Sequence, residues 1–325
     1  MRFRLIPFAL AAAACLAAPA VAPAKLTVGI SENQSAMFTD PHFSGLGVKH
    51  ARVVVSYNVM TSRDDELGRV SAYLTLARAA GVQPLVSFEH ARGDASICAK
   101  RRNHRKAVCK LPSQRAYRNS VRRFLRAFPW VRTISPWNEV NHFTQPTSRN
   151  PKAAAGFTNT VAKLCRSCTI VAADILDQAD RTRGKRKPTY RHTTNYIKRF
   201  KRALKVPRKV CGLHNYSDVN RFRGHGTKAL VKALGCRQVW LTETGGLYKF
   251  ASFWTKKTRK GCKNAIACQI KATKYMFSLA RRNKRVKRLY VYTYFGNVTP
   301  RFDAGLVDAR TGLPRKAYAE VKKRT

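Results

Sequence analysis

The fold is decided by residues 50–90, in which "HARVVVSYN" (50–58) and "QPLVSFEH" (83–90) flank "DDELGRVSAYLTLARAAG" (64–81). The two outer runs are short and almost continuously apolar, as are the strands of a parallel sheet that is buried on both faces. The middle segment has acids in its first turn, apolar residues at helical spacing and a closing glycine. The segment therefore predicts a strand–helix–strand unit with parallel strands.

The same alternation continues through the chain. Apolar runs that qualify as strands lie at 25–31, 50–58, 83–90, 131–139, 168–176, 209–217, 237–245 and 288–296. Further amphipathic helices are predicted at 113–128, 151–165, 191–204, 226–235, 264–283 and 313–324. The helix after the first strand, within "SAMFTDPHFSGLG" (35–47), is the least regular because it is short and contains Pro41.

Eight strand–helix rounds predict an α/β fold, a closed (β/α)8 TIM barrel that forms a single domain over residues 25–325. The alternative is an open, doubly wound sheet. That fold predicts a glycine-rich phosphate loop after the first strand, and "GISENQSAMF" (29–38) contains none.

The first 24 residues predict a secretory signal peptide. Arg2 and Arg4 precede an apolar run over 5–18, and "APA" (22–24) supplies small residues for cleavage. The apolar run is too short for a comfortable membrane span, and no later segment has the pattern of one. We therefore expect a secreted, extracellular protein with no membrane span.

The chain has 9 cysteines, and Cys15 falls within the predicted signal peptide. An even number remains in an exported chain, which favours disulfides. Sequence neighbours suggest the pairs Cys98 with Cys109, Cys165 with Cys168, Cys211 with Cys236, and Cys262 with Cys268. The alternative reading of "CRSC" as half of a zinc site lacks a second half. We expect no metal.

The composition is strongly basic, with 64 Lys and Arg against 16 Asp and Glu and a formal charge of +48. Loss of Arg2 and Arg4 lowers this charge to about +46. Such a field favours polyanions, but the basic residues are scattered and form no dedicated nucleic-acid motif. A solvated basic surface on a monomer is the simpler interpretation.

Two glutamates are predicted at ends of strands where barrel active sites lie. Glu139 ends the run 131–139, and Glu243 lies near the end of 237–245. Hydrolysis of a glycosidic bond needs two carboxyls, one to protonate the leaving oxygen and one to attack or to activate water. In a retaining enzyme the two would be about 5–5.5 Å apart.

This arrangement resembles the clan A glycoside hydrolases, retaining (β/α)8 enzymes that include families 5, 39 and 128. The resemblance rests on Asn138-Glu139 on the fourth strand and Glu243 in "TETG" on the seventh. It implies that Glu139 is the acid/base, that Glu243 is the nucleophile and that Asn138 hydrogen-bonds the sugar 2-hydroxyl. Clan membership also implies a β-linked substrate and requires no cofactor.

Three other segments extend the resemblance. "GVKHARVVVSYN" (47–58) would supply Arg52 near the nucleophile, and "LHNY" (213–216) would supply His214 and Tyr216, with the tyrosine on the nucleophile. "FDAGLVDARTGLPRKAYAEVK" (302–322) is similar to the closing segment of the clan. Each side chain also has a structural interpretation: Arg52 as an ion-pair partner and His214 as a core histidine.

The aromatic residues depart from the clan pattern. The eighth strand of many such enzymes ends in a tryptophan that forms a sugar platform, whereas this chain has Tyr292, Tyr294 and Phe295 there. Tyr292 is a candidate substitute, and Trp254, outside the predicted strands, is another platform candidate. Glu89 either lines the cleft or forms a loop salt bridge, and the salt bridge is the simpler interpretation.

The residues and the resemblance together predict a secreted retaining glycoside hydrolase that works by double displacement, with a raised pKa on Glu139 while Glu243 is charged. The positive field favours an anionic carbohydrate substrate. The alternative is a catalytically silent carbohydrate- or cell-wall-binding barrel that uses its basic surface.

Overall fold

The computed structural model describes residues 26–61, 65–180, 188–250, 262–298 and 302–325. The predicted signal peptide (1–24) and Trp254 lie outside these ranges. Within them, none of the helices is long and apolar enough to cross a membrane.

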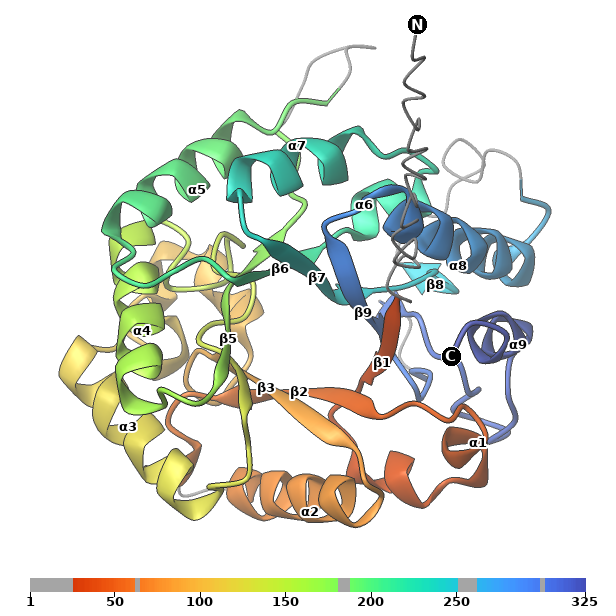
Figure 1. Ribbon diagram of the computed structural model, residues 1–325, viewed down its shortest axis with the longest axis horizontal. Helices are drawn as coiled ribbons and strands as arrows, with labels where there is room; N and C mark the ends of the chain where they lie inside the picture. The colour runs from red at the N-terminus through yellow and green to blue at the C-terminus, as the bar shows by residue number, and fades with distance from the viewer. Residues whose placement is uncertain (1–25, 62–64, 181–187, 251–261, 299–301) are drawn as a thin grey trace, which may run out of the picture.

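The strands close into a parallel barrel in chain order, which confirms the predicted (β/α)8 fold. Figure 1 shows this ring of strands with helices around its outside. The barrel strands are β1 (Thr27–Ser31), β2 (His50–Ser56), β3 (Gln83–Glu89), β4 (Thr133–Ser135), β5 (Thr169–Leu176), β6 (Val210–His214), β7 (Gln238–Thr244) and β9 (Val286–Tyr292). A separate antiparallel pair joins β8 (Lys249–Phe250) to β10 (Phe302–Asp303).

The outer helices follow the predicted pattern, except that α6 was not predicted. They are α1 (Pro41–Ser44), α2 (Glu66–Ala79), α3 (Gln114–Ala127), α4 (Pro151–Leu164), α5 (Arg191–Ala203), α6 (Tyr216–Asn220), α7 (His225–Leu234), α8 (Ala265–Arg282) and α9 (Lys316–Lys322). Between β1 and β2 the chain forms a 3-10 turn over Ser35–Thr39 and the single turn of α1, in keeping with the irregular sequence there.

Local chemistry explains where these helices begin. The Ser113 hydroxyl accepts a hydrogen bond from the Ala116 N–H at 3.1 Å and caps α3. The Asn150 side chain caps α4 through the Ala153 N–H at 3.0 Å, and Pro151 occupies the first turn. Along α3, Tyr117, Val121 and Phe124 are buried at helical spacing and pack the helix against the barrel.

The barrel has two buried layers. The larger one lies between strands and helices. A separate cluster is formed by Leu85, Val171, Val210, Trp240 and Tyr290, which belong to five different strands. This cluster fills part of the barrel interior, so the barrel has a packed core and is not a pore.

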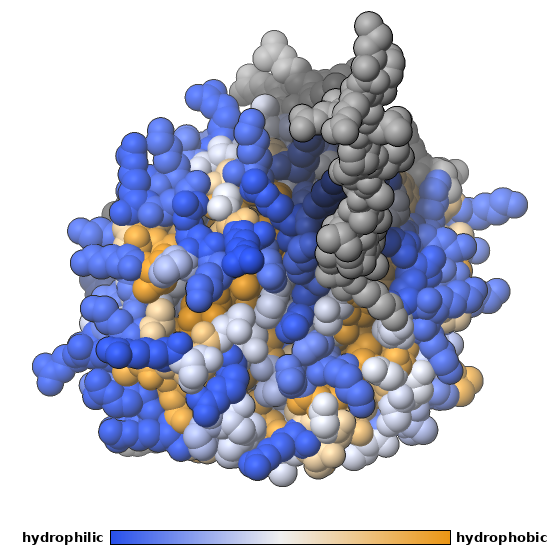
Figure 2. All heavy atoms as spheres, in the orientation of Figure 1, coloured by the Kyte–Doolittle hydropathy of each residue, from blue (hydrophilic) through white to orange (hydrophobic). Residues whose placement is uncertain are grey.

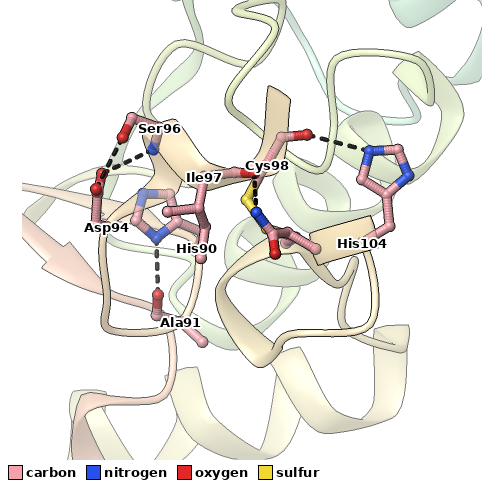
Figure 3. The surroundings of a disulfide bond; sticks show 9 residues. His90, Ala91, Asp94, Ser96, Ile97, Cys98 and His104 are labelled. Carbon is pink, nitrogen blue, oxygen red and sulfur yellow. Dashed lines mark hydrogen bonds between the residues drawn. A yellow bond between two sulfur atoms is a disulfide. The ribbon is translucent and has the colours of Figure 1, made fainter. Parts of the chain in front are cut away.

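The eight cysteines form the four predicted disulfides, with Cα–Cα distances from 5.1 to 6.0 Å. The Cys98–Cys109 bridge closes the connection between β3 and α3 (Figure 3). In that loop the His104 ring contacts the Cys98 carbonyl oxygen at 3.1 Å, and Asp94 accepts hydrogen bonds from the Ser96 N–H and hydroxyl, both at 2.8 Å. The loop is therefore held by its own contacts as well as by the bridge.

Candidate active site

Glu139 and Glu243 meet at the C-terminal end of the barrel. Strand β4 ends at Ser135, four residues earlier than predicted, so Glu139 lies in the following turn. Glu243 is the penultimate residue of β7. One carboxylate oxygen of each glutamate and a ring nitrogen of His214 all lie within 4.8 Å of one another. This spacing agrees with the short separation of a retaining pair and not with the wider gap of an inverting one.

The turn that carries Glu139 has an unusual backbone. Glu139 has a φ of +42°, in the left-handed region that residues other than glycine rarely adopt. The turn is fixed on both sides, because the His142 N–H bonds the Glu139 carbonyl at 2.8 Å and the Val140 N–H bonds the Asp174 carbonyl at 3.0 Å. Such strain occurs most often at functional sites, where neighbouring contacts stabilise it.

Two donors hold the Glu243 carboxylate. Arg52 Nη1 donates to Oε2 at 2.7 Å, and the Tyr216 hydroxyl donates to Oε1 at 2.9 Å. Tyr216 is the first residue of α6 and not the end of a strand as predicted, because β6 already ends at His214. Both oxygens of Glu243 are therefore fixed in position by groups from different parts of the barrel.

Arg52 lies inside the barrel and is fully buried. Its Nη1 donates to the Ser31 hydroxyl at 3.1 Å, and its Nη2 donates to Asn138 Oδ1 at 2.7 Å and to Asp174 Oδ2 at 3.4 Å. One guanidinium thus links Glu243 to Asn138 beside Glu139. The predicted ion pair of Arg52 is present, and the same side chain lies beside the predicted nucleophile.

Asp174 on β5 is a buried carboxylate that the sequence analysis missed. It accepts hydrogen bonds from the hydroxyls of Ser87, Ser135 and Thr242 at 2.8–2.9 Å. Burial raises the pKa of Asp174, but Arg52 and these hydrogen bonds outweigh burial and lower it. The signal was an aspartate in the apolar run "IVAADIL" (170–176), where an acid has no reason to lie unless it is paired.

His214 contacts the other glutamate. Its Nδ1 lies 3.0 Å from Glu139 Oε1, and the imidazole is fully buried. Burial alone lowers the pKa of His214, but the charge of Glu243 and the contact with Glu139 raise it overall. His214 is a core histidine, as its structural interpretation required, and it also contacts a predicted catalytic residue.

The prediction of a raised pKa for Glu139 is wrong. Burial does raise the pKa of this carboxyl, but the hydrogen bond and charge of His214 lower it below the usual value. The reason is a partner that the sequence could not place, since His214 is 75 residues away in the chain.

Glu139, His214 and Glu243 are also the one group of three side chains, within the described ranges, that could hold a metal ion. Arg52 already places a positive charge 2.7 Å from Glu243, and Tyr216 uses its other oxygen. A second cation would be repelled there, so the geometry suits acid–base chemistry better than metal binding.

Glu139 and Glu243 line a cleft of about 750 Å³. Tyr292 lines it, with its ring 6.3 Å from that of Tyr216 and 5.9 Å from that of Phe302. Tyr294 is fully buried and packs against Phe43 away from the cleft. Tyr292, the last residue of β9 and thus of the eighth barrel strand, therefore reaches the cleft, whereas Tyr294 does not. Trp254 lies outside the described residues.

Asn138 and Glu89 lie beside the pair. Asn138 accepts from Arg52, as described, and its side chain also hydrogen-bonds Glu89. Glu89 further lies 3.5 Å from the His90 ring. Burial raises the pKa of Glu89, and this outweighs His90 and Asn138. Glu89 is the last residue of β3 and not part of a loop as predicted, and its carboxyl helps to hold Asn138 besides contacting His90.

No family model matches this sequence, and no curated protein matches it. The fold, however, is similar to that of solved glycoside hydrolases. A family 39 glycoside hydrolase from Bacteroides cellulosilyticus WH2 is 14% identical with a TM-score of 0.58, over 93% of this chain. This chain spans only 63% of the length of that enzyme.

Two xylanases resemble it over nearly their whole length. The enzyme from Paenibacillus barcinonensis has a TM-score of 0.62 and 11% identity, over 93% of this chain and 98% of its own. The enzyme from Clostridium stercorarium F9 has a TM-score of 0.61 and 11% identity, over 91% and 96%. The chain therefore shares the barrel fold of clan A glycoside hydrolases.

Proposed function

We propose that this protein is a secreted retaining glycoside hydrolase that cleaves β-linked O-glycosidic bonds. The observation that carries the proposal is the pair of carboxylates within 4.8 Å at the mouth of the barrel, beside the cleft. Secretion is supported by the four disulfides, which persist in oxidising compartments.

In the proposed mechanism Glu243 attacks the anomeric carbon while Glu139 gives a proton to the departing oxygen. The glycosyl–oxygen bond breaks, and a covalent ester forms on Glu243. Glu139 then removes a proton from water, which attacks the same carbon and releases the sugar with its configuration retained.

The proton for the first step is shared between Glu139 and His214. Because they are 3.0 Å apart and buried together, they titrate as a pair and not as separate groups. A pKa of Glu139 that is lowered in this pair is compatible with the acid role if His214 returns the proton when the leaving oxygen arrives. Asn138, placed by Arg52, would contact the sugar 2-hydroxyl.

The test is a panel of aryl β-glycosides and β-linked polysaccharides, followed by Glu243→Ala and Glu139→Gln on whichever substrate is cleaved. Each variant should lose about a thousandfold or more in kcat. The matched control is Glu320→Gln on α9, which removes a carboxyl that pairs with Arg324 far from the cleft. Parent-like rates in both site variants would overturn the proposal.

Added azide distinguishes the nucleophile from the acid/base. It should rescue Glu243→Ala by attacking from the nucleophile's face and give a glycosyl azide of inverted configuration. With Glu139→Ala it should replace water in the second step and give the retained azide. If a glycan of the panel is bound but none is cleaved, the barrel is instead a carbohydrate-binding protein.

A further inference from the structure

The cleft has a second charged region away from the glutamates. Arg221 and Arg223 line it just beyond α6. Tyr216, which bonds Glu243, is the first residue of the same helix. At about 1.5 Å per helical residue, Arg221 lies roughly 7–8 Å farther along the helix axis. Both regions line the same cleft, so a glycan of several sugar units can contact both.

The two arginines are held in place by Ser217 and Asp218 of α6. Arg223 Nε donates to Asp218 Oδ1 at 3.1 Å, and Asp218 is fully buried. The Ser217 hydroxyl oxygen accepts from Arg223 Nη2 at 2.7 Å and from Arg221 Nη1 at 3.0 Å. Both guanidinium groups thus converge on one hydroxyl, an arrangement that brings like charges together.

The two nearby acids are almost fully buried, although Asp177 also lines the cleft. Asp218 also accepts from the Thr227 N–H at 2.6 Å, and the two oxygens of Asp177 accept from the N–H groups of Ser217 and Asp218 at 3.2 and 3.0 Å. Asp177 is only 3% exposed, whereas the Arg223 side chain is 22% exposed. The groups at this end that reach solvent are therefore mainly cationic.

The two guanidinium groups repel each other, and the nearby carboxylates of Asp177 and Asp218 offset only part of this repulsion. Burial and the charge of Arg223 lower the pKa of Arg221. An oxyanion would relieve this repulsion, and the guanidinium fork matches the geometry of carboxylate and sulfate oxygens.

Aromatic rings complete the cleft. Phe250 and Phe302 lie 5.5 Å apart, centroid to centroid, and both line the cavity with Tyr292. Phe250 is 39% exposed although its side chain is wholly apolar. Aromatic walls with a few fixed polar groups are typical of ligand sites.

We propose that Arg221 and Arg223 bind an anionic substituent, a carboxylate or a sulfate ester, on a sugar unit adjacent to the one held at Glu139 and Glu243. The substrate class would then be an acidic β-linked glycan. This inference rests on the proposed function for the meaning of the neighbouring sugar, but binding can be measured without hydrolysis.

The experiment measures dissociation constants by calorimetry, with Glu139→Gln in every protein to prevent turnover. The probes are a tetrasaccharide with β-linked glucuronate units, its carboxyl-reduced counterpart and a sulfated form of that counterpart. We expect either charged probe to bind roughly tenfold more tightly than the neutral one. The charged form that binds more tightly identifies carboxylate or sulfate as the preferred group.

The variants separate this site from the general positive field. Arg221→Gln with Arg223→Gln should remove the preference and change affinity for the neutral probe by less than about twofold. The matched control, Arg122→Gln with Arg126→Gln on α3, removes the same charge from exposed positions and should keep the preference. Arg221→Gln alone tests the site if loss of Arg223 disturbs Asp218.

Two results would overturn the inference: equal binding of charged and neutral probes, or an equal loss of preference in both double variants. Failure of the proposed function looks different. In that case the charged probes bind preferentially, but the unmodified protein hydrolyses no glycoside. Hydrolysis of neutral glycans without any preference for charged ones would leave the function intact and remove this inference.

Discussion

The mouth of the barrel and the outer face of α3 use charge in opposite ways. At the mouth Glu243 and Asp174 pair with one buried arginine, Arg52, and Glu139 lies beside Glu243. From residue 95 to 138 the sequence has 12 Lys and Arg and no acid, and every arginine of α3 is exposed. Figure 2 likewise shows hydrophilic side chains projecting along both flanks of the molecule.

The difference shows where the scarce acids are needed. An exposed arginine is solvated and needs no partner, since surface ion pairs contribute little. A buried one must be neutralised, and the carboxylates of Glu243 and Asp174, which pair with Arg52, are each fixed by several hydrogen bonds. Charge at the mouth is therefore positioned, whereas charge on α3 contributes mainly a general field.

The largest effect should follow from Arg52→Met. This change leaves Asp174 and Glu243 without their buried counter-charge and should lower the free energy of unfolding by about 3–5 kcal/mol. Arg122→Met on α3 is the matched control and should change it by about 0.5 kcal/mol or less. Urea unfolding of both variants measures the contrast. Equal effects would mean that the two regions do not differ as described.

Tyr216→Phe should have a smaller effect, and mainly on catalysis. It removes the 2.9 Å hydrogen bond to Glu243 and keeps the ring in its aromatic contacts. A hydrogen bond to a charged group contributes about 1.5–3 kcal/mol, so kcat should fall roughly 10- to 100-fold. Tyr275→Phe on α8 is the control, and steady-state kinetics gives both values. An unchanged kcat for Tyr216→Phe would contradict the role of the hydroxyl.

The free energy of unfolding should depend on pH through His214 at the mouth of the barrel. Because its folded-state pKa is raised above the unfolded value of about 6.5, its contribution to stability is complete below that pH and is lost as pH rises through the folded pKa. Unfolding free energies of the parent and of His214→Gln, measured from pH 5 to 9, should converge as pH rises. A constant difference across this range would disprove the linkage.

His50, at the start of β2 and thus at the opposite end of the barrel, should behave in the reverse way. Burial and the charge of Arg288 lower the pKa of His50 to about 4. As pH falls from about 6.5 towards 4, the unfolded chain binds this proton first, so stability falls by on the order of 1–2 kcal/mol. The free energy of unfolding of His50→Gln, measured over the same pH range, should lack this decrease. An equal decrease in parent and variant would contradict the lowered pKa of His50.

The sequence predicted the barrel well because its signal is repeated. Each round gives an independent apolar run, so an error at one boundary, such as the end of β4 at Ser135 and not at residue 139, does not alter the topology. Glu139 and Glu243 could be placed at the mouth because strand ends converge there whatever the exact register.

Other site features depend on contacts between distant residues, which no local pattern encodes. The lowered pKa of Glu139 needs His214, and the positions of Ser87, Ser135 and Thr242 around Asp174 need closure of the barrel. Gly212 gives a similar case, because a Cβ there would overlap an Asp174 carboxylate oxygen. In the sequence it is simply a glycine within a strand.

The central claim is that Glu243 forms a covalent bond to the sugar, and trapping tests it most directly. The protein is incubated with the 2,4-dinitrophenyl 2-deoxy-2-fluoro-β-glycoside of whichever sugar the panel selects, and its peptides are analysed by mass spectrometry. We predict the added mass of one fluoroglycosyl group on the peptide that contains Glu243. An adduct on another residue, or continued turnover of the parent glycoside with the anomeric configuration inverted, would contradict the account.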